Sequence, residues 1–225
     1  MKVALARFIL ISFALIVGFL AVKYGLANLS YLKVNTYLER WQKENVLTQD
    51  ELDDAFKSSD MMLKLHGHHP HYLNMTAKLY EWKAFKFEDD DAIVRDSLEK
   101  ALVLYKKSSE LRSHWPLTWI YMANIKSRFG EYDDDFYQYL ANAINYGPYM
   151  DMINLQVAQL FLLHADEMPD FPNEVAFEQI NRALSGVNVR AQLLDFADFI
   201  GQVEFVCTIG HVNNNEWVAE QSLCQ

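Results

Sequence analysis

The stretch HWPLTWIYMANIKSRFGEYDDDFYQYLANAINYGPY, residues 114–149, decides the fold. Apolar residues recur in it every three or four positions, which is the period of an α-helix with one buried face. Pro116 suits the first position of a helix, and Gly130 suits the tight turn that follows it. The stretch therefore predicts two antiparallel helices, over residues 116–129 and 133–146, joined by a short turn.

This helix pair resembles a tetratricopeptide repeat. In that family the first helix carries a large, an apolar and a small residue, a Gly-x-Tyr turn follows, and a small residue lies on the second helix. The matching positions are Trp119, Met122, Ala123, Gly130, Tyr132, Tyr139 and Ala143, with Gly147 and Pro148 at the exit. One extra residue in the DDD run at 133–135 departs from the pattern. The resemblance implies a helical hairpin whose small residues let the helices approach closely.

An internal repeat extends this pattern towards the N-terminus. A shift of 46 residues aligns Asp50, Leu52, Ala55, Leu65, His68, Pro70 and Ala77 with Asp96, Leu98, Ala101, Leu111, His114, Pro116 and Ala123. This step is longer than the 34 residues of a tetratricopeptide repeat. We expect the excess in an acidic loop at residues 87–92, and hence two or three irregular hairpins rather than a regular array.

Helical periodicity continues through most of the chain, and no series of strands is predicted. The capping box TQDE at Thr48 begins a helix that ends before the HGHHP segment. Further helices are expected over residues 70–87, 92–112, 149–165, 172–184 and 189–205. Short connections favour antiparallel neighbours. The predicted fold class is all-α, with an N-terminal transmembrane helix followed by antiparallel helical hairpins that are tetratricopeptide-like and irregular.

The N-terminal segment is apolar enough for a membrane. Residues 8–22 carry no charge, and the wider range 3–29 supplies the roughly 20 residues that a spanning helix needs. A retained anchor and a secretory signal cleaved after Ala27 are the two interpretations. The charge of Lys23 favours the anchor, because a cleavage region is normally uncharged.

The predicted organisation follows from this anchor. Residues 1–32 form the anchor and the start of a juxtamembrane helix, and residues 33–225 form one helical domain. Cys207 and Cys224 are an even pair, and a disulfide between them would stabilise an exported domain by about 3 kcal/mol; two unrelated thiols are the alternative. We therefore expect a single-pass protein of the bacterial inner membrane, with the N-terminus in the cytoplasm and the C-terminal domain in the periplasm.

Composition excludes some classes of function. The chain has 20 Lys and Arg against 30 Asp and Glu, a net charge of -10, which argues against nucleic-acid binding and disfavours anionic lipid surfaces. The sequence contains no GxSxG, HExxH or Gly-rich phosphate loop. We predict no catalytic residue and no cofactor, and hence a protein that is not an enzyme.

Four histidines gather around Pro70: His66, His68, His69 and His71. Imidazoles bind zinc and copper, but a single loop seldom orients three of them on one ion, so they are weak metal-ligand candidates. The alignment of His68 with His114 favours a structural role in the turn. The acidic runs 89–91 and 133–135 lack the Gly and the later Glu of a calcium-binding EF-hand loop, which favours solvated loops.

Over nearly its whole length the chain resembles the VpsP-type family of polysaccharide-biosynthesis cluster proteins. The resemblance rests on the N-terminal apolar segment and on HPHYLNMTAKLYEW (69–82), HWPLTWIYMA (114–123), FGEYDDDFYQYLANAINYGPY (129–149) and QVEFVC (202–207). It implies a membrane-anchored helical protein that assists the synthesis or export of an exopolysaccharide. The residues it carries over are architectural: His68, Pro70, Tyr72, His114, Trp115, Pro116, Trp119, Tyr146, Gly147 and Pro148.

The sequence thus leads to one main hypothesis and two alternatives. The main one is an adaptor that binds protein components of a polysaccharide synthesis or export system through a concave face. The first alternative is a carbohydrate-binding module that holds glycan on exposed aromatic rings. The second is an envelope scaffold unrelated to polysaccharide. Gly18 and Gly25 form no GxxxG pair, so the oligomeric state stays open.

Overall fold

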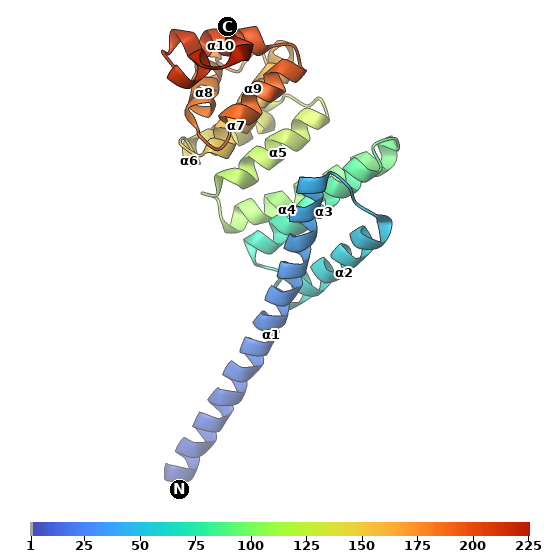
Figure 1. The fold of residues 1–225 in the computed structure, drawn as a ribbon. Coiled ribbons are helices and arrows are strands. Elements are labelled where there is room, and N and C mark those ends of the chain that lie inside the picture. The colour runs from blue at the N-terminus through green and yellow to red at the C-terminus, as the bar shows by residue number, and fades with distance from the viewer. Residues whose placement is uncertain (1) are drawn as a thin grey trace. The chain divides into compact units, whose positions relative to one another are not determined.

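In the computed structural model, the backbone is described over residues 2–225 and the side chains over residues 5–225. These residues form helices and no strand (Figure 1). The α-helices are α1 (Lys2–Glu44), α2 (Gln49–His66), α3 (Pro70–Lys86), α4 (Asp91–Leu111), α5 (Pro116–Arg128), α6 (Asp134–Tyr146), α7 (Asp151–His164), α8 (Asn173–Ser185), α9 (Arg190–Phe199), α10 (Val203–Val212) and α11 (Glu216–Ala219). The predicted all-α fold class is confirmed.

The chain divides into two compact units. Unit 1, Met1–Arg112, contains α1 to α4, and unit 2, Ser113–Gln225, contains α5 to α11. The boundary expected after residue 32 lies inside α1, which continues without a break to Glu44. The division falls in the short connection between the end of α4 and the start of α5.

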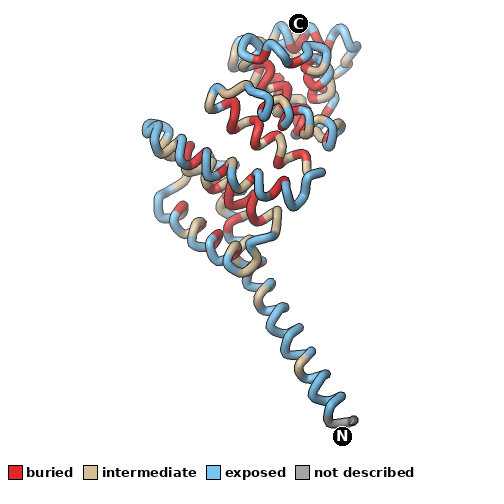
Figure 2. Tube along the Cα trace, turned by 180° about the vertical axis from the view of Figure 1, so that it is seen from behind, coloured by how far each residue is buried: buried red, intermediate tan, exposed pale blue. Residues whose placement is uncertain are grey.

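α1 is one helix with two different halves. Its 43 residues extend about 65 Å at 1.5 Å per residue. The first half is long and apolar enough to cross a membrane, and its large apolar side chains before Lys23 are exposed (Figure 2). The second half presents Ala27, Val34 and Trp41 to the other helices of unit 1, and all three are fully buried. The same helix is therefore a candidate membrane span and the first packed helix of unit 1.

Polar contacts secure α1 to α2 beside this apolar core. Lys33 Nζ lies 2.6 Å from Asp54 Oδ2, which also accepts a hydrogen bond of 2.7 Å from Tyr37 Oη. The hydrogen bonds from Lys33 and Tyr37 hold the pKa of Asp54 below its usual value. At the start of α2, Thr48 and Glu51 form the expected capping box.

The 46-residue repeat relates α2 to α4 and α3 to α5, whereas the closely packed pairs are α1 with α2 and α3 with α4. Each repeated segment is therefore the second helix of one pair followed by the first helix of the next. The acidic-loop prediction is wrong, because residues 87–90 form a short connection. The extra length lies in α3 and α4, which have 17 and 21 residues against 13 in each of α5 and α6.

Unit 2 contains the pairs α5 with α6 and α7 with α8, followed by shorter helices. The single helix expected over residues 189–205 is wrong, because it is broken into α9 and α10. Gly201 has φ +73°, and Gln202 N donates to Ala197 O at 2.7 Å, the pattern of a Schellman helix end. Gly130 ends α5 in the same way with φ +68°. Pro172 is the N-cap of α8 rather than its first helical residue.

Candidate functional site: a groove across α5, α7 and α9

A groove of about 430 Å³ runs across three helices of unit 2. α7 packs against both α5 and α9, so its outward face forms the floor between them. The side chains that characterise the groove are Asn124 and Arg128 on α5, Met152, Gln156, Gln159 and Leu163 on α7, and Gln192 and Phe196 on α9.

The sequence of α7 explains why one face of this helix forms the floor of the groove. Met152, Gln156, Gln159 and Leu163 are spaced by four, three and four residues, which puts them on one helical face. The remaining surface of α7 is buried and mostly apolar, and it includes Ile153, Val157 and Leu162. Met152 and Leu163 remain 40% and 51% exposed, so the groove offers apolar surface beside its amides.

The polar groups of the groove are mainly amides. Asn124 Nδ2 donates a hydrogen bond of 2.7 Å to Gln156 Oε1, which joins α5 to α7. An amide side chain both donates and accepts hydrogen bonds, as a peptide group does. Among the described lining residues none is a carboxylate, and Arg128 contributes a positive charge. This chemistry suits an extended peptide with apolar side chains.

One end of the groove is fixed by a small polar cluster. His164 Nδ1 lies 2.7 Å from Glu167 Oε2, and the ring of Tyr132 lies 5.6 Å from the ring of His164. Hydrogen bonds with Tyr132 and His164 hold the pKa of Glu167 below its usual value. Tyr132, which the sequence singles out only as a turn residue, thus helps to orient a side chain that lines the groove.

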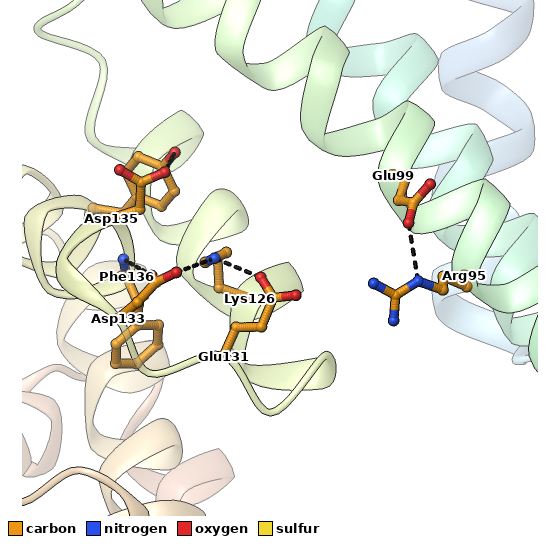
Figure 3. Close-up of polar contacts among 8 residues, drawn as sticks. Arg95, Glu99, Lys126, Glu131, Asp133, Asp135 and Phe136 are labelled. Atoms are coloured by element: carbon orange, nitrogen blue, oxygen red, sulfur yellow. Dashed lines mark hydrogen bonds and ion pairs between the residues drawn. The ribbon is translucent and has the colours of Figure 1, made fainter.

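A buried lysine secures the turn between α5 and α6. Lys126 Nζ lies 2.5 Å from Glu131 Oε2 and 2.6 Å from Asp133 Oδ2, and its side chain is 8% exposed (Figure 3). Burial alone would lower the pKa of Lys126, because it disfavours the charged ammonium group. Hydrogen bonds to Asp133 and Glu131 outweigh this effect, and the pKa of Lys126 is raised. Asp133 also accepts a hydrogen bond of 3.1 Å from Phe136 N and so caps α6. Sequence patterns missed Lys126, because a lysine gives no sign of burial without its packing partners.

The residues predicted from the repeat fix contacts between helices. Ala77, Ala123 and Ala143 are fully buried. Trp119 Nε1 donates a hydrogen bond of 2.6 Å to Ser113 O, and the ring of His114 lies 4.8 Å from that of Tyr146. Pro148 O accepts a hydrogen bond of 2.5 Å from Arg182 Nη1, while Pro70 and Pro116 each begin a helix. None of these residues lines the groove, and Ala77 and Pro70 lie in unit 1 rather than in the unit that contains it.

The four histidines lie where α2 turns into α3. The ring of His66 lies 5.0 Å from that of His69, and His69 packs at 4.3 Å against the ring of Tyr72. His68 is exposed. Over the described part of the chain, no group of three or more His, Cys, Asp or Glu side chains is arranged to hold a metal ion. The acidic runs instead supply helix caps, from Asp90 to α4 and from Asp133 to α6.

The cysteines and tryptophans have structural surroundings. The Sγ atoms of Cys207 and Cys224 lie at bonding distance with their Cα atoms 5.3 Å apart, which joins α10 to the last residues of the chain. Trp41 is fully buried, and the other tryptophans, at positions 82, 115, 119 and 217, are half-buried. None of the five tryptophans is largely exposed, whereas Tyr149 and Phe199 are 83% and 88% exposed.

Comparisons with known proteins support the fold. No family model and no curated protein sequence matches the chain. Among solved structures, it is similar to the crystal structure of a thermophilic tetratricopeptide-repeat protein of Thermus thermophilus. The two share 17% sequence identity with a TM-score of 0.53, over 78% of this chain and 97% of the other. The described helices therefore have a tetratricopeptide-like fold.

Proposed function

We propose that the protein is a membrane-anchored adaptor. In this proposal α1 holds the chain in a membrane, and the groove across α5, α7 and α9 binds an extended peptide segment of a partner protein. The observation that carries the proposal is the groove, which combines amide groups with exposed apolar side chains on adjacent helices. The proposed role is binding rather than catalysis.

The lining residues define the peptide that would fit. Gln156, Gln159 and Gln192 supply hydrogen-bond groups for the peptide backbone, and Met152 and Leu163 supply contacts for apolar side chains. Arg128 favours a peptide that carries a carboxylate at the matching position. The proposed partner segment is therefore apolar or acidic rather than basic.

Site-specific photocrosslinking in native membranes tests this proposal. A crosslinker at Gln159 lies in the groove, whereas one at Gln138, an exposed position on α6, lies outside it. We expect a defined partner band from Gln159 that is absent from Gln138 and is lost when Leu163→Asp is added. Identical bands from both positions, or a band insensitive to Leu163→Asp, would count against the groove as the binding site.

The finer proposal concerns location and pathway. We propose that α1 is a retained anchor in a bacterial inner membrane, that the helical units lie in the periplasm, and that the partners belong to an exopolysaccharide synthesis or export system. The support is the resemblance to the VpsP-type family, the apolar first half of α1, and the cysteine pair, which suits an oxidising compartment.

A deletion strain tests this finer proposal separately. We expect the strain to lose secreted polysaccharide or to change its chain length, and to recover only with the anchored protein. An exported form that lacks residues 1–28 serves as the matched control. Unchanged polysaccharide would remove the pathway from the proposal, while the crosslinking result decides the adaptor role independently.

A further inference from the structure

The turn between α2 and α3 lies against α1 at the point where the apolar stretch of α1 ends. The uncharged run ends at Val22 and is followed by Lys23 and Tyr24. The ring of Tyr24 lies 4.7 Å from that of His66, and Ala27, less than one helical turn further on, is fully buried. Figure 1 shows the N-terminal part of α1 projecting beyond the other helices of unit 1. If α1 spans a membrane, this turn therefore lies at its surface.

Hydrogen bonds show which chain segments share this end of unit 1. Ser108 Oγ, near the end of α4, donates to Pro70 O at 2.9 Å, so α4 ends beside the start of α3. At the opposite end, Lys86 Nζ at the close of α3 lies 3.5 Å from Leu47 O in the α1–α2 connection. We call residues 23–24, 64–71 and 106–112 the proximal end, and residues 43–54 and 86–91 the distal end.

Charge is divided sharply between these two ends. The proximal end carries five cations, Lys23, Lys64, Lys106, Lys107 and Arg112, and one carboxylate, Glu110. The distal end carries two cations and nine carboxylates, which are Glu44, Asp50, Glu51, Asp53, Asp54, Glu88, Asp89, Asp90 and Asp91. The net charge of -10 for the whole chain conceals a positive face directly beside the apolar segment.

We infer that the proximal end of unit 1 binds the phosphate groups of anionic phospholipids in the membrane that α1 spans. Two observations identify this occupant: the surface is continuous with the apolar half of α1, and its charge is opposite to that of the headgroups. Lysine and arginine side chains near an anionic leaflet each strengthen binding by about fivefold. This inference rests on the proposed membrane anchor and adds that unit 1 is held against the headgroup layer rather than only tethered.

The full-length protein in lipid nanodiscs provides the test. A fluorophore on His68→Cys reports the exposed turn, and nitroxide groups on the lipid headgroups quench it when it is close. We expect stronger quenching when phosphatidylglycerol is mixed with phosphatidylcholine than in phosphatidylcholine alone. Added salt should remove the difference, because the contact is electrostatic.

Two matched triple variants assign the effect to the proximal end. Lys64→Gln, Lys107→Gln and Arg112→Gln together should weaken binding to anionic lipid by about 100-fold, because each lost charge costs about fivefold, and the quenching difference should disappear. Lys43→Gln, Lys57→Gln and Lys83→Gln remove the same number of charges elsewhere in unit 1 and should leave it unchanged. Far-ultraviolet circular dichroism confirms that each variant remains folded.

The outcomes separate this inference from the anchor on which it rests. Alkaline extraction of native membranes reports the anchor alone, and release of the protein would overturn the membrane-spanning role of α1. If the protein stays in the membrane but the label responds equally to neutral and anionic lipid, the headgroup inference is wrong and the anchor stands. An equal loss in both triple variants would likewise overturn the assignment to the proximal end.

Discussion

Gly147 and Pro116 approach each other so closely that no side chain fits between them. A Cβ atom added to Gly147 would lie 2.8 Å from Pro116 Cβ and 3.1 Å from Ile153 Cγ1. Pro116 begins α5, whereas Gly147 follows the end of α6. The glycine that ends one helix of the pair therefore permits close packing against the start of the other.

Gly147→Ala should destabilise unit 2. The added methyl group has to displace a proline ring, which is a rigid neighbour, and overpacking of this kind costs about 1 to 3 kcal/mol. Denaturant unfolding of the full chain followed by circular dichroism measures the change. Asn145→Ala, an exposed position in the last turn of α6, is the matched control and should change the free energy of unfolding little. Equal stability of Gly147→Ala and the original protein would show that the close approach is relaxed in solution.

This contact also shows how far the sequence alone could lead. Proline, glycine and aspartate mark where helices begin and end within residues 114–149. The predicted helices at 116–129 and 133–146 therefore agree with α5 and α6 within one residue. The weaker signals failed at two places. The acidic residues at 87–92 predicted a long loop, but one of them caps a helix. Periodicity predicted one continuous helix through Gly201, but the chain breaks there into two helices.

The groove and the charge division were not predictable, because both depend on which helices become neighbours. Asn124 and Gln156 are 32 residues apart in sequence and meet only because α5 packs on α7. The five proximal cations are dispersed over three chain segments, and a net charge cannot show that they share one end. Periodicity identifies helices, but a surface formed by several helices requires their packing.

Lys126→Met should loosen the turn between α5 and α6. Methionine fills a similar volume but leaves Glu131 and Asp133 without their shared partner. Because those carboxylates are 40% and 54% exposed, water replaces part of the lost interaction, and we expect a loss of about 1 to 2 kcal/mol. Thermal unfolding of the full chain measures this loss.

The pH dependence of this variant checks the cause. Hydrogen bonding to Lys126 holds the pKa of Asp133 below its ordinary value. The stabilisation by this ion pair is therefore fully present at a pH above the ordinary pKa of an aspartate, and it is lost as the pH falls through the lowered pKa of Asp133. The difference between Lys126→Met and the original protein should therefore shrink in acid. Asp134→Asn, one residue along, serves as a control. A difference that stays constant down to strongly acidic pH would show that packing, rather than the ion pairs, is responsible.

His69 and His71 should make unit 1 less stable in mild acid. Burial is the main cause that lowers the pKa of both imidazoles. His66 on α2 adds to the effect at His69, and Lys78 on α3 adds to the effect at His71. Arg112, after α4, lowers the pKa of both. The rings of Tyr24, Tyr31 and Tyr72 also line this region. Because the unfolded chain takes up protons first, stability should fall as the pH drops below about 6.5 and level off once the folded protein is also protonated.

Thermal unfolding in a neutral detergent at a series of pH values measures this effect without anionic lipid. His69→Gln should weaken the dependence between neutral and mildly acidic pH, whereas His68→Gln, at an exposed position, should leave it unchanged. A dependence that is the same in both variants would assign it to groups outside this turn.

The cysteine pair predicts a dependence of stability on the compartment in which the protein folds. Cys207 and Cys224 are 17 residues apart, and closing a loop of this length stabilises a protein by about 3 kcal/mol through the entropy of the unfolded chain. Cys207→Ser should therefore lower the melting temperature of protein recovered from the oxidising side of a membrane. It should have little effect on protein kept reduced, which is the internal control. Thiol labelling of denatured protein adds a direct measurement: exported protein should bind no reagent, and labelling of both cysteines would show that no disulfide forms.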